Sequence, residues 1–322
     1  NLKEVVQATI GLLDSPKLST KDLMNFVPSP DFPTKAEIIS SREELEEIYT
    51  SGRGSIKLRA TYEVENGEIV INSLPYQVSS SKILEQIASQ IDSKKITMIE
   101  DLRDESDETN PVRIIIVPRS NRIDKNALMS HLFATTELQK NVRANLNAIG
   151  LNGKPRVFDL KGILKEWIKF RTETVKRRLQ HRLDWVNDRL HILDGLLKAY
   201  LNLDEVIKII RTHDKPKKAL MKKFKLSEIQ ANAILDIRLR QLAKLEEEAI
   251  LLEKKDLSTE AKGIEKILAS SSRLKTLLKK ELKEDLDEYG DERNSNIVEA
   301  EEAKAFDEKD LISNDPMTVV LS

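Results

Sequence analysis

One stripe of apolar side chains limits what this chain can fold into more than any other feature. Its members follow one another at steps of 4, 3, 4, 3 and 4 residues and are Leu179, Leu183, Val186, Leu190, Leu193 and Leu197. Side chains at this spacing line one narrow face of an α-helix, as the a and d positions of a coiled coil do. A helix of about 40 residues would be about 60 Å long. It cannot form a compact core alone and therefore needs a partner helix.

A second apolar stripe further along the chain is the expected partner. It consists of Leu235, Leu239 and Leu242, followed by Ile264, Leu268, Ser271, Leu274, Leu278 and Leu282. Between the two stripes, Pro216 breaks the helical pattern and Ser227 is a suitable helix N-cap. We therefore predict an antiparallel coiled-coil arm, residues 156–200 and 243–290, which carries a helical knob, residues 201–242.

The knob has more apolar side chains than one short helical hairpin can cover. The candidates for a dimer interface are Leu226, Ile229, Ile234, Leu235, Ile237, Leu239 and Leu242. Of these we expect Ile229, Ile234, Leu235, Ile237 and Leu239 to stay exposed in a single chain. An uncovered apolar patch of this kind marks an interface, and two-fold dimers are the most common solution. The alternative is a knob that buries its own core.

The first half of the chain mixes strand and helix patterns. Residues 1–35 form a helical lead-in that ends in a proline-rich connector, and residues 36–155 are predicted to be an α+β domain with a small, mainly antiparallel sheet. The expected elements are a strand over 55–64, a hairpin turn at 65–67, a strand over 68–74, a helix over 80–91, a strand over 113–117 and a helix capped by Asp124. The fold class is therefore multidomain α+β, with this domain followed by the coiled-coil arm and its dimerisation knob.

The formal net charge of −1 conceals separate basic and acidic regions. Residues 161–182 and 208–225 are rich in lysine and arginine, whereas residues 284–310 are acidic, and residues 291–322 are predicted to be an acidic tail and linker. Basic clusters bind polyanions such as nucleic acid by releasing counterions from phosphates. A solvated helix face explains an isolated basic run equally well.

Several classes of site are excluded or unsupported by composition. The chain has no cysteine, which excludes disulfides and thiolate chemistry, and its 4 histidines do not have metal-ligand spacing, so no metal site is predicted. No apolar run approaches the roughly 20 residues that cross a bilayer, and no signal peptide is recognisable. We expect a piece of a longer cytoplasmic protein.

Five colinear motifs resemble a known family, the type IIA topoisomerase A subunits. They are Pro30–Thr34 (PDFPT), Gly52–Gly54 (GRG), Leu74–Val78 (LPYQV), Leu102–Asp107 (LRDESD) and Ile234–Leu242 (ILDIRLRQL). Within the family, IVPRSNR at 116–122 and HLFATT at 131–136 are similar to the topoisomerase IV branch of proteobacteria rather than to gyrase. The chain has Lys35-Ala36-Glu37 where many members have two glycines, which also fits that branch.

The resemblance implies a role for each predicted part. Residues 36–155 would be the tower domain, the arm would be the family's coiled coil, and the knob would be its dimeric exit gate. The winged-helix domain with the nucleophilic tyrosine would precede Asn1, and a C-terminal β-pinwheel would follow residue 322. No residue here is then catalytic, and this piece alone is expected to be inactive.

The whole enzyme implied by the resemblance is an ATP-dependent type II topoisomerase. Two A subunits and two ATPase B subunits would cleave, pass and religate duplex DNA, which gives decatenation, relaxation and chromosome segregation. The B subunit, rather than this piece, would bind Mg²⁺ and ATP. The expected location is the cytoplasm, in association with the chromosome, with peripheral attachment at the inner membrane as a variant. The alternatives are the corresponding piece of gyrase, a non-enzymatic coiled-coil protein that organises chromosomes, and an RNA-binding helical arm.

Candidate DNA contacts lie in the predicted tower domain. Strand alternation places Arg53, Lys57 and Arg59 on one face, and Arg119 and Arg122 could extend it. These side chains would contact phosphates and position the duplex without reading its sequence. The alternative is that Arg53 and Arg59 pair with acidic neighbours such as Glu63 or Glu68. The basic runs 161–182 and 208–225 are candidates to line a cavity for the transported duplex.

Overall fold

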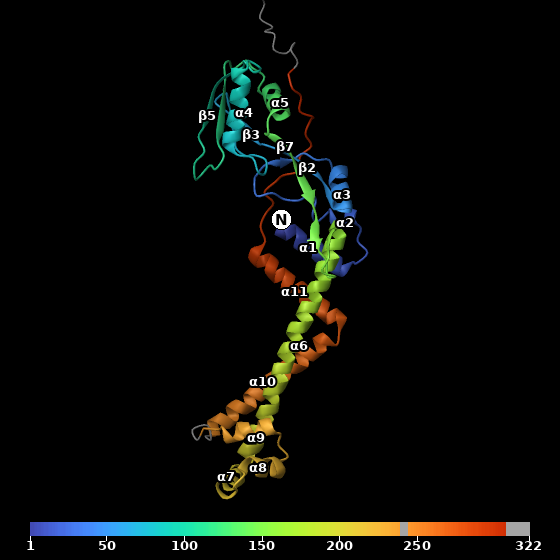
Figure 1. The fold of residues 1–322 in the computed structure, drawn as a ribbon, viewed down its shortest axis with the longest axis vertical. Helices are drawn as coiled ribbons and strands as arrows, with labels where there is room; N and C mark the ends of the chain where they lie inside the picture. Colours follow the sequence, from blue (N-terminus) through green and yellow to red (C-terminus); the bar gives the residue numbers. More distant parts are fainter. Residues whose placement is uncertain (239–243, 307–322) are drawn as a thin grey trace, which may run out of the picture. The chain divides into compact units, whose positions relative to one another are not determined.

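The computed structural model describes residues 1–238 and 244–306, and for residues 244–246 it describes the backbone alone. The chain divides into two compact units, one formed by residues 1–167 together with the part after residue 281, and the other by residues 168–281 (Figure 1). The expected combination of helices and antiparallel sheet is present.

The first unit begins with two helices, α1 (Leu2–Asp14) and α2 (Thr20–Leu23). Ser19 caps α2 in a reciprocal capping box with Asp22, so that two otherwise unpaired N–H groups are satisfied. The proline-rich connector then leads into β1 (Glu37–Ile38) and α3 (Arg42–Ser51).

A three-stranded antiparallel sheet has the order β1-β2-β7, where β2 is Arg53–Arg59 and β7 is Gln139–Asn145. The chain turns from α3 into β2 at Gly52, which has a φ of 73°. A Cβ atom at Gly52 would overlap the carbonyl oxygen of Phe158, and one at Gly54 would overlap the side chain of Ile48. Both glycines of the Gly-Arg-Gly motif therefore allow the main chain to approach another part of this chain closely.

A four-stranded antiparallel sheet with the order β3-β4-β6-β5 holds the largest core of the first unit. Its strands are β3 (Tyr62–Glu65), β4 (Glu68–Ile71), β5 (Ile99–Asp104) and β6 (Ile114–Pro118). The helices α4 (Ser80–Asp92) and α5 (Lys125–Thr135) contribute apolar side chains to the same core. Asp124 caps α5, as predicted. Asn66 and Gly67 have positive φ angles in the turn between β3 and β4, as the predicted hairpin requires.

The single strand predicted over 55–64 is wrong, because the chain changes sheets in the middle of it. The N–H of Ala60 donates to the carbonyl of Leu138 beside the three-stranded sheet, whereas the N–H of Thr61 donates to Ser73 beside the four-stranded sheet. The apolar alternation continues across this break, so the pattern carries no sign of it.

The first unit is completed by a short hairpin and a docked C-terminal segment. The hairpin consists of β8 (Asn147–Ile149) and β9 (Pro155–Val157). Residues 291–306, which we call the strap, pair with β1 through a parallel bridge between Ile38 and Ile297. The strap ends against α5, where the N–H of Phe306 donates to Nδ1 of His131 at 2.9 Å and the two rings stack. The described part of the predicted acidic tail is therefore packed against the body of the unit.

The helices of the second unit are joined by short turns, and no strand occurs in its described residues. Its elements are α7 (Leu203–Thr212), α8 (Pro216–Phe224), α9 (Glu228–Leu235) and α10 (Lys244–Leu268), with most of α6 (Leu160–Leu201) and part of α11 (Ser271–Tyr289). The predicted stripe on α6 packs against α10, where Leu183, Val186 and Leu193 meet Leu257, Ala261 and Ile264.

The partner stripe differs from the prediction at its first residue. Leu235 packs into the knob core and not into the seam between α6 and α10. Leu239 and Leu242 lie outside the described residues. Ile264 and Leu268 are in the seam as predicted. The second helix also ends at Leu268 and restarts at Ser271, so that α10 and α11 are separate helices.

Candidate nucleic-acid interface

The candidate interface is one face of the sheet formed by β2 and β7. The two strands pair over seven positions, so that Arg53, Ser55, Lys57 and Arg59 lie opposite Asn145, Arg143, Asn141 and Gln139. Residues directly opposite in an antiparallel pair project from the same side of the sheet. These eight side chains therefore form one surface, which we call the polar face. Arg53, Lys57 and Arg59 share it, as strand alternation predicted.

The opposite side of β2 is buried, and this fixes the orientation of the polar face. Ile56 and Leu58 are 1% and 0% exposed, and Gly54 lets Ile48 of α3 pack directly on the strand. A shift of β2 by one residue would move this apolar set to the solvent, so the register is strongly determined.

Two arginines of the polar face are available for an external anion. The side chains of Arg53 and Arg143 are exposed, and neither forms an ion pair with a described residue. Lys57 is held by Glu44 of α3, with an Nζ–Oε1 distance of 2.7 Å. That hydrogen bond, together with one from the backbone of Ser41, lowers the pKa of Glu44.

Arg59 has a different environment from the other cations of the polar face. Its Nε donates to Gln139 Oε1 at 2.9 Å, and its Nη2 donates to the carbonyl of Glu301 in the strap at 2.8 Å. The guanidinium also lies over the ring of Phe133. Burial lowers the pKa of Arg59, and the charge of Glu37 opposes that shift. Much of its hydrogen-bonding capacity is thus used within the chain.

The alternative in which Arg53 and Arg59 pair with Glu63 or Glu68 is wrong. Glu68 accepts two hydrogen bonds from Arg103 at 3.0 Å, and Glu63 accepts one from Asn72. Both glutamates lie in the four-stranded sheet and have partners there.

Arg119 and Arg122 do not lie on the polar face. They follow β6, at the end of a strand of the four-stranded sheet. Arg119 donates from Nε to the carbonyl of Ile99 at 3.3 Å. The side chain of Arg122 is exposed and has no bonded partner among the described residues. Their contact with DNA stays a prediction.

Arg143 is the residue that strand alternation missed. It lies opposite Ser55, between the levels of Arg53 and Lys57. Its spacing from Asn141 and Asn145 gives a polar alternation along β7. This polar alternation places Arg143 beside the cations of β2 only when residues 139–145 are known to pair with residues 53–59.

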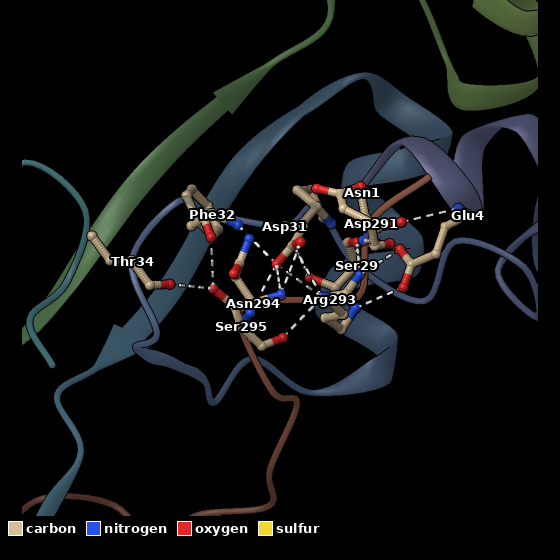
Figure 2. Close-up of polar contacts among 11 residues, drawn as sticks. Asn1, Glu4, Ser29, Asp31, Phe32, Thr34, Asp291, Arg293, Asn294 and Ser295 are labelled. Carbon is tan, nitrogen blue, oxygen red and sulfur yellow. Dashed lines mark hydrogen bonds and ion pairs between the residues drawn. The ribbon is translucent and has the colours of Figure 1, made fainter. Parts of the chain in front are cut away.

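A second cluster of polar residues joins the strap to the start of the chain (Figure 2). Arg293 donates from Nε and Nη2 to the two carboxylate oxygens of Glu4, each at 2.7 Å. It also donates to the backbone carbonyls of Ser29, Pro30 and Ser295. Both side chains of the pair are only 16% exposed. This is a structural anchor and not a catalytic arrangement, since Arg293 and Glu4 have their partners inside the chain.

Asp31 of the PDFPT motif serves the same anchor. Its carboxylate accepts from the backbone N–H groups of Asn294 and Ser295, at 3.1 and 2.8 Å. Burial alone would raise the pKa of Asp31, but these hydrogen bonds and the charge of Arg293 together lower it. The motif therefore holds the strap, which explains a carboxylate at this position without any contact to DNA.

The basic runs of the helical unit are partly neutralised by neighbouring helices. Arg171 and Arg178 both pair with Glu281 of α11, and Arg182 pairs with Glu260 of α10. Arg189 pairs with Glu253 at 2.7 Å. These contacts favour a role of α6 arginines in joining the helices, and they leave fewer charges for a transported duplex.

The knob buries part of the predicted dimer interface within itself. Leu226 and Ile234 are 6% and 3% exposed and pack with Val206, Ile209 and Leu220. The prediction that Ile234 stays exposed is therefore wrong, because α7 and α8 cover it. Ile229 is 61% exposed, as predicted.

The remaining gate candidates are either partly buried or outside the described residues. Leu235 and Ile237 are partly buried against the knob core. Leu239 and Leu242 lie outside the described residues. Ile229 is thus the most accessible of the described candidates.

Two classes of feature are missing from the described residues. No group of three or more histidine, cysteine, aspartate or glutamate side chains there could hold a metal ion. No described helix is long and apolar enough to span a membrane.

The sequence that folds into this α+β unit and this helical unit matches the model of a known family. The family model for the A subunits of DNA gyrase/topoisomerase IV matches residues 1–283, and the chain belongs to this family. Over its whole length it is 54% identical to the DNA topoisomerase 4 A subunit of Escherichia coli (strain K12) and 56% to that of Pseudomonas aeruginosa. It is 41% identical to that of Neisseria gonorrhoeae. The chain spans 43%, 43% and 44% of the length of these relatives.

The match confirms the resemblance stated from the motifs. It excludes the coiled-coil organising protein and the RNA-binding arm as families for this chain. The family model is common to gyrase and topoisomerase IV, whereas the relatives cited above are A subunits of topoisomerase 4.

Proposed function

We propose that this chain is the DNA-handling and dimer-gate portion of a topoisomerase IV A subunit. In the full enzyme, two A subunits and two ATPase B subunits cleave, pass and religate duplex DNA, which supports decatenation, relaxation and chromosome segregation. The support is the identity of more than half of the residues across the whole chain with A subunits of DNA topoisomerase 4.

In this proposal, the first unit is the tower domain and its polar face contacts the DNA backbone. The observation that carries the proposal is the exposed pair Arg53 and Arg143, held on a rigid sheet without an ion-pair partner among the described residues. Guanidinium groups suit this task because their fork of N–H donors matches phosphate oxygens. Asn141 and Asn145 add neutral donors on the same face. Such contacts position a duplex and read no sequence.

The second unit then forms the arm and the exit gate. The seam between α6 and α10 gives the arm its rigidity, and an apolar contact at the knob, centred on Ile229, joins two copies. The gate must separate to release a duplex and close again afterwards. A small contact patch suits such an interface, since only part of the knob's apolar surface is left outside its own core.

The chemical step belongs to other parts of the enzyme. The nucleophilic tyrosine lies in the winged-helix domain, and this piece alone is inactive. ATP and Mg²⁺ are bound by the B subunit. The assembled enzyme acts in the cytoplasm on the chromosome.

The test is duplex binding by this chain over a range of salt concentrations. The double variant R53Q/R143Q should bind a duplex more weakly, and the slope of log K against log salt should become shallower by about 0.9 for each lost phosphate contact. The control is R103Q, which removes one positive charge from the other sheet, where Arg103 is already paired with Glu68. An unchanged slope in the double variant, or an equal change in the control, would contradict the assignment of the polar face.

A further inference from the structure

The knob contains a hollow that its role as a gate does not explain. The hollow has a volume of ≈ 750 Å³ and lies between α7 and α8. Its basic lining consists of Lys208, Lys218, Lys222, Lys223 and His213. Pockets that bind small molecules usually have volumes of about 300–1,000 Å³, so its size suits a compact ligand.

The charge of this hollow is poorly compensated. Glu205 is its only lining carboxylate among the described residues, and it is already paired with Lys223 at 2.8 Å. Lys208, Lys218 and Lys222 have no ion-pair partner in the described part of the chain. Four lysines against one glutamate leave a net formal charge of +3 when His213 is neutral.

Such a concentration of like charge disfavours the compact fold unless an anion offsets it. The neighbouring helix α9 could have supplied carboxylates, but its Glu228 pairs with Lys217, which does not line the hollow. Ile209 and Ala219 also line the hollow, so it offers apolar surface on which lysine stems can lie. Lysine side chains act as adaptable point charges for phosphate groups.

The clustering of positive charge favours a compact anion over a duplex. A duplex spreads its phosphates along a rod, so that few of them can lie near one small group of lysines. A chain of linked phosphates places several charges within a few ångströms and can enter. The side chains converge from two helices on one space, which is the arrangement that a small ligand requires.

We propose that the hollow between α7 and α8 is a binding site for a compact anion with two or more linked phosphates. The phosphates belong either to a free polyphosphate or to the phosphate chain of a nucleotide, and Lys218 and Lys222 of α8 contact them together with Lys208 of α7. The site is independent of the polar face and of the duplex contacts proposed for it.

The test is calorimetric titration of the 322-residue chain at low salt with tripolyphosphate, ATP without divalent cations, and a short DNA duplex. We expect saturable binding of one tripolyphosphate per chain, and a loss of affinity of about tenfold or more in K218Q/K222Q, since two charged donors to phosphate oxygens are removed. ATP binding tighter than tripolyphosphate identifies a nucleotide as the source, and equal or weaker binding identifies free polyphosphate.

The matched control is K176Q/K217Q, which removes the same charge from lysines that are paired outside the hollow. Amide chemical-shift changes on the unmodified chain provide a second readout and should be confined to α7, α8 and the turn between them. The proposal is overturned by an absence of saturable phosphate binding, by an equal loss in the control, or by binding of the duplex alone.

Discussion

The anchor around Arg293 provides the sharpest test of how the strap is held. In R293A, Glu4 remains in a site where only 16% of its side chain is exposed, and it loses two hydrogen bonds of 2.7 Å. Removing one partner of a buried ion pair costs about 3–5 kcal/mol, and the partial exposure places this pair near the lower end, at about 3 kcal/mol.

The strap opening should be measured by native-state hydrogen exchange, because the chain has two units and one unfolding transition cannot be assumed. The N–H of Val298 is a suitable reporter, since it donates to the carbonyl of Ile38 at 3.0 Å and closes the strap onto β1. A loss of about 3 kcal/mol corresponds to a decrease in protection of about 100-fold.

The matched control is K3A, in the same helix as Glu4. Lys3 pairs with Glu292 at 2.5 Å, but the two side chains are 41% and 87% exposed. An exposed pair contributes about 0–1 kcal/mol, so the exchange of Val298 should change by less than about fivefold. If R293A changes that exchange no more than K3A does, the burial of the ion pair does not hold the strap and the reasoning is refuted.

Three further predictions concern the first unit, and a fourth concerns the knob. Because the pKa of Asp31 is lowered, its stabilisation is present above its ordinary value of 3.8 and is lost as pH falls through the lowered pKa, which exchange at strap amides will detect. Burial lowers the pKa of His131, so the neutral ring stabilises the docked strap fully above pH ~6.5. This stabilisation is lost as pH falls through the lowered pKa, and hydrogen exchange at strap amides should then become faster. G52A should lower the thermal stability of the first unit more than G153A, because both glycines have φ near 73° but only Gly52 would place a Cβ against another residue. I229D should convert a dimer into a monomer in sedimentation at micromolar concentration, and a monomeric parent chain would contradict the gate.

The apolar periodicities predicted most of the secondary structure, and the failures share a physical cause. The stripe on α6 and the helix over Ser80–Asp92 repeat at helical spacing over three or more turns, so local pattern and tertiary packing agree. At Ala60 and Thr61 the strand pattern continues while the chain passes from one sheet to another. That break depends on Leu138 and Ser73, which are distant in sequence, and no local signal marks it.

The same cause separates the correct from the missed predictions at the candidate site. Alternation within one strand correctly grouped Arg53, Lys57 and Arg59, because it depends only on residues two apart. It could not find Arg143, which joins them through pairing between strands. It also could not show that Arg59 is engaged, because the carbonyl that it contacts belongs to Glu301, 242 residues later.

Arg59 connects the polar face with the strap, and under the proposed DNA contact this connection would affect how a duplex binds. A phosphate that approached the guanidinium of Arg59 would compete with Gln139 and with the carbonyl of Glu301 for the same N–H donors. Lys57 would have to leave Glu44. Arg53 and Arg143 require no such exchange, so the first contacts with a duplex should form at the end of β2 where the strand begins. If the polar face binds DNA as proposed, Arg53 and Arg143 should make the first contacts, and Lys57 and Arg59 should follow only where the duplex compensates for the bonds that they lose.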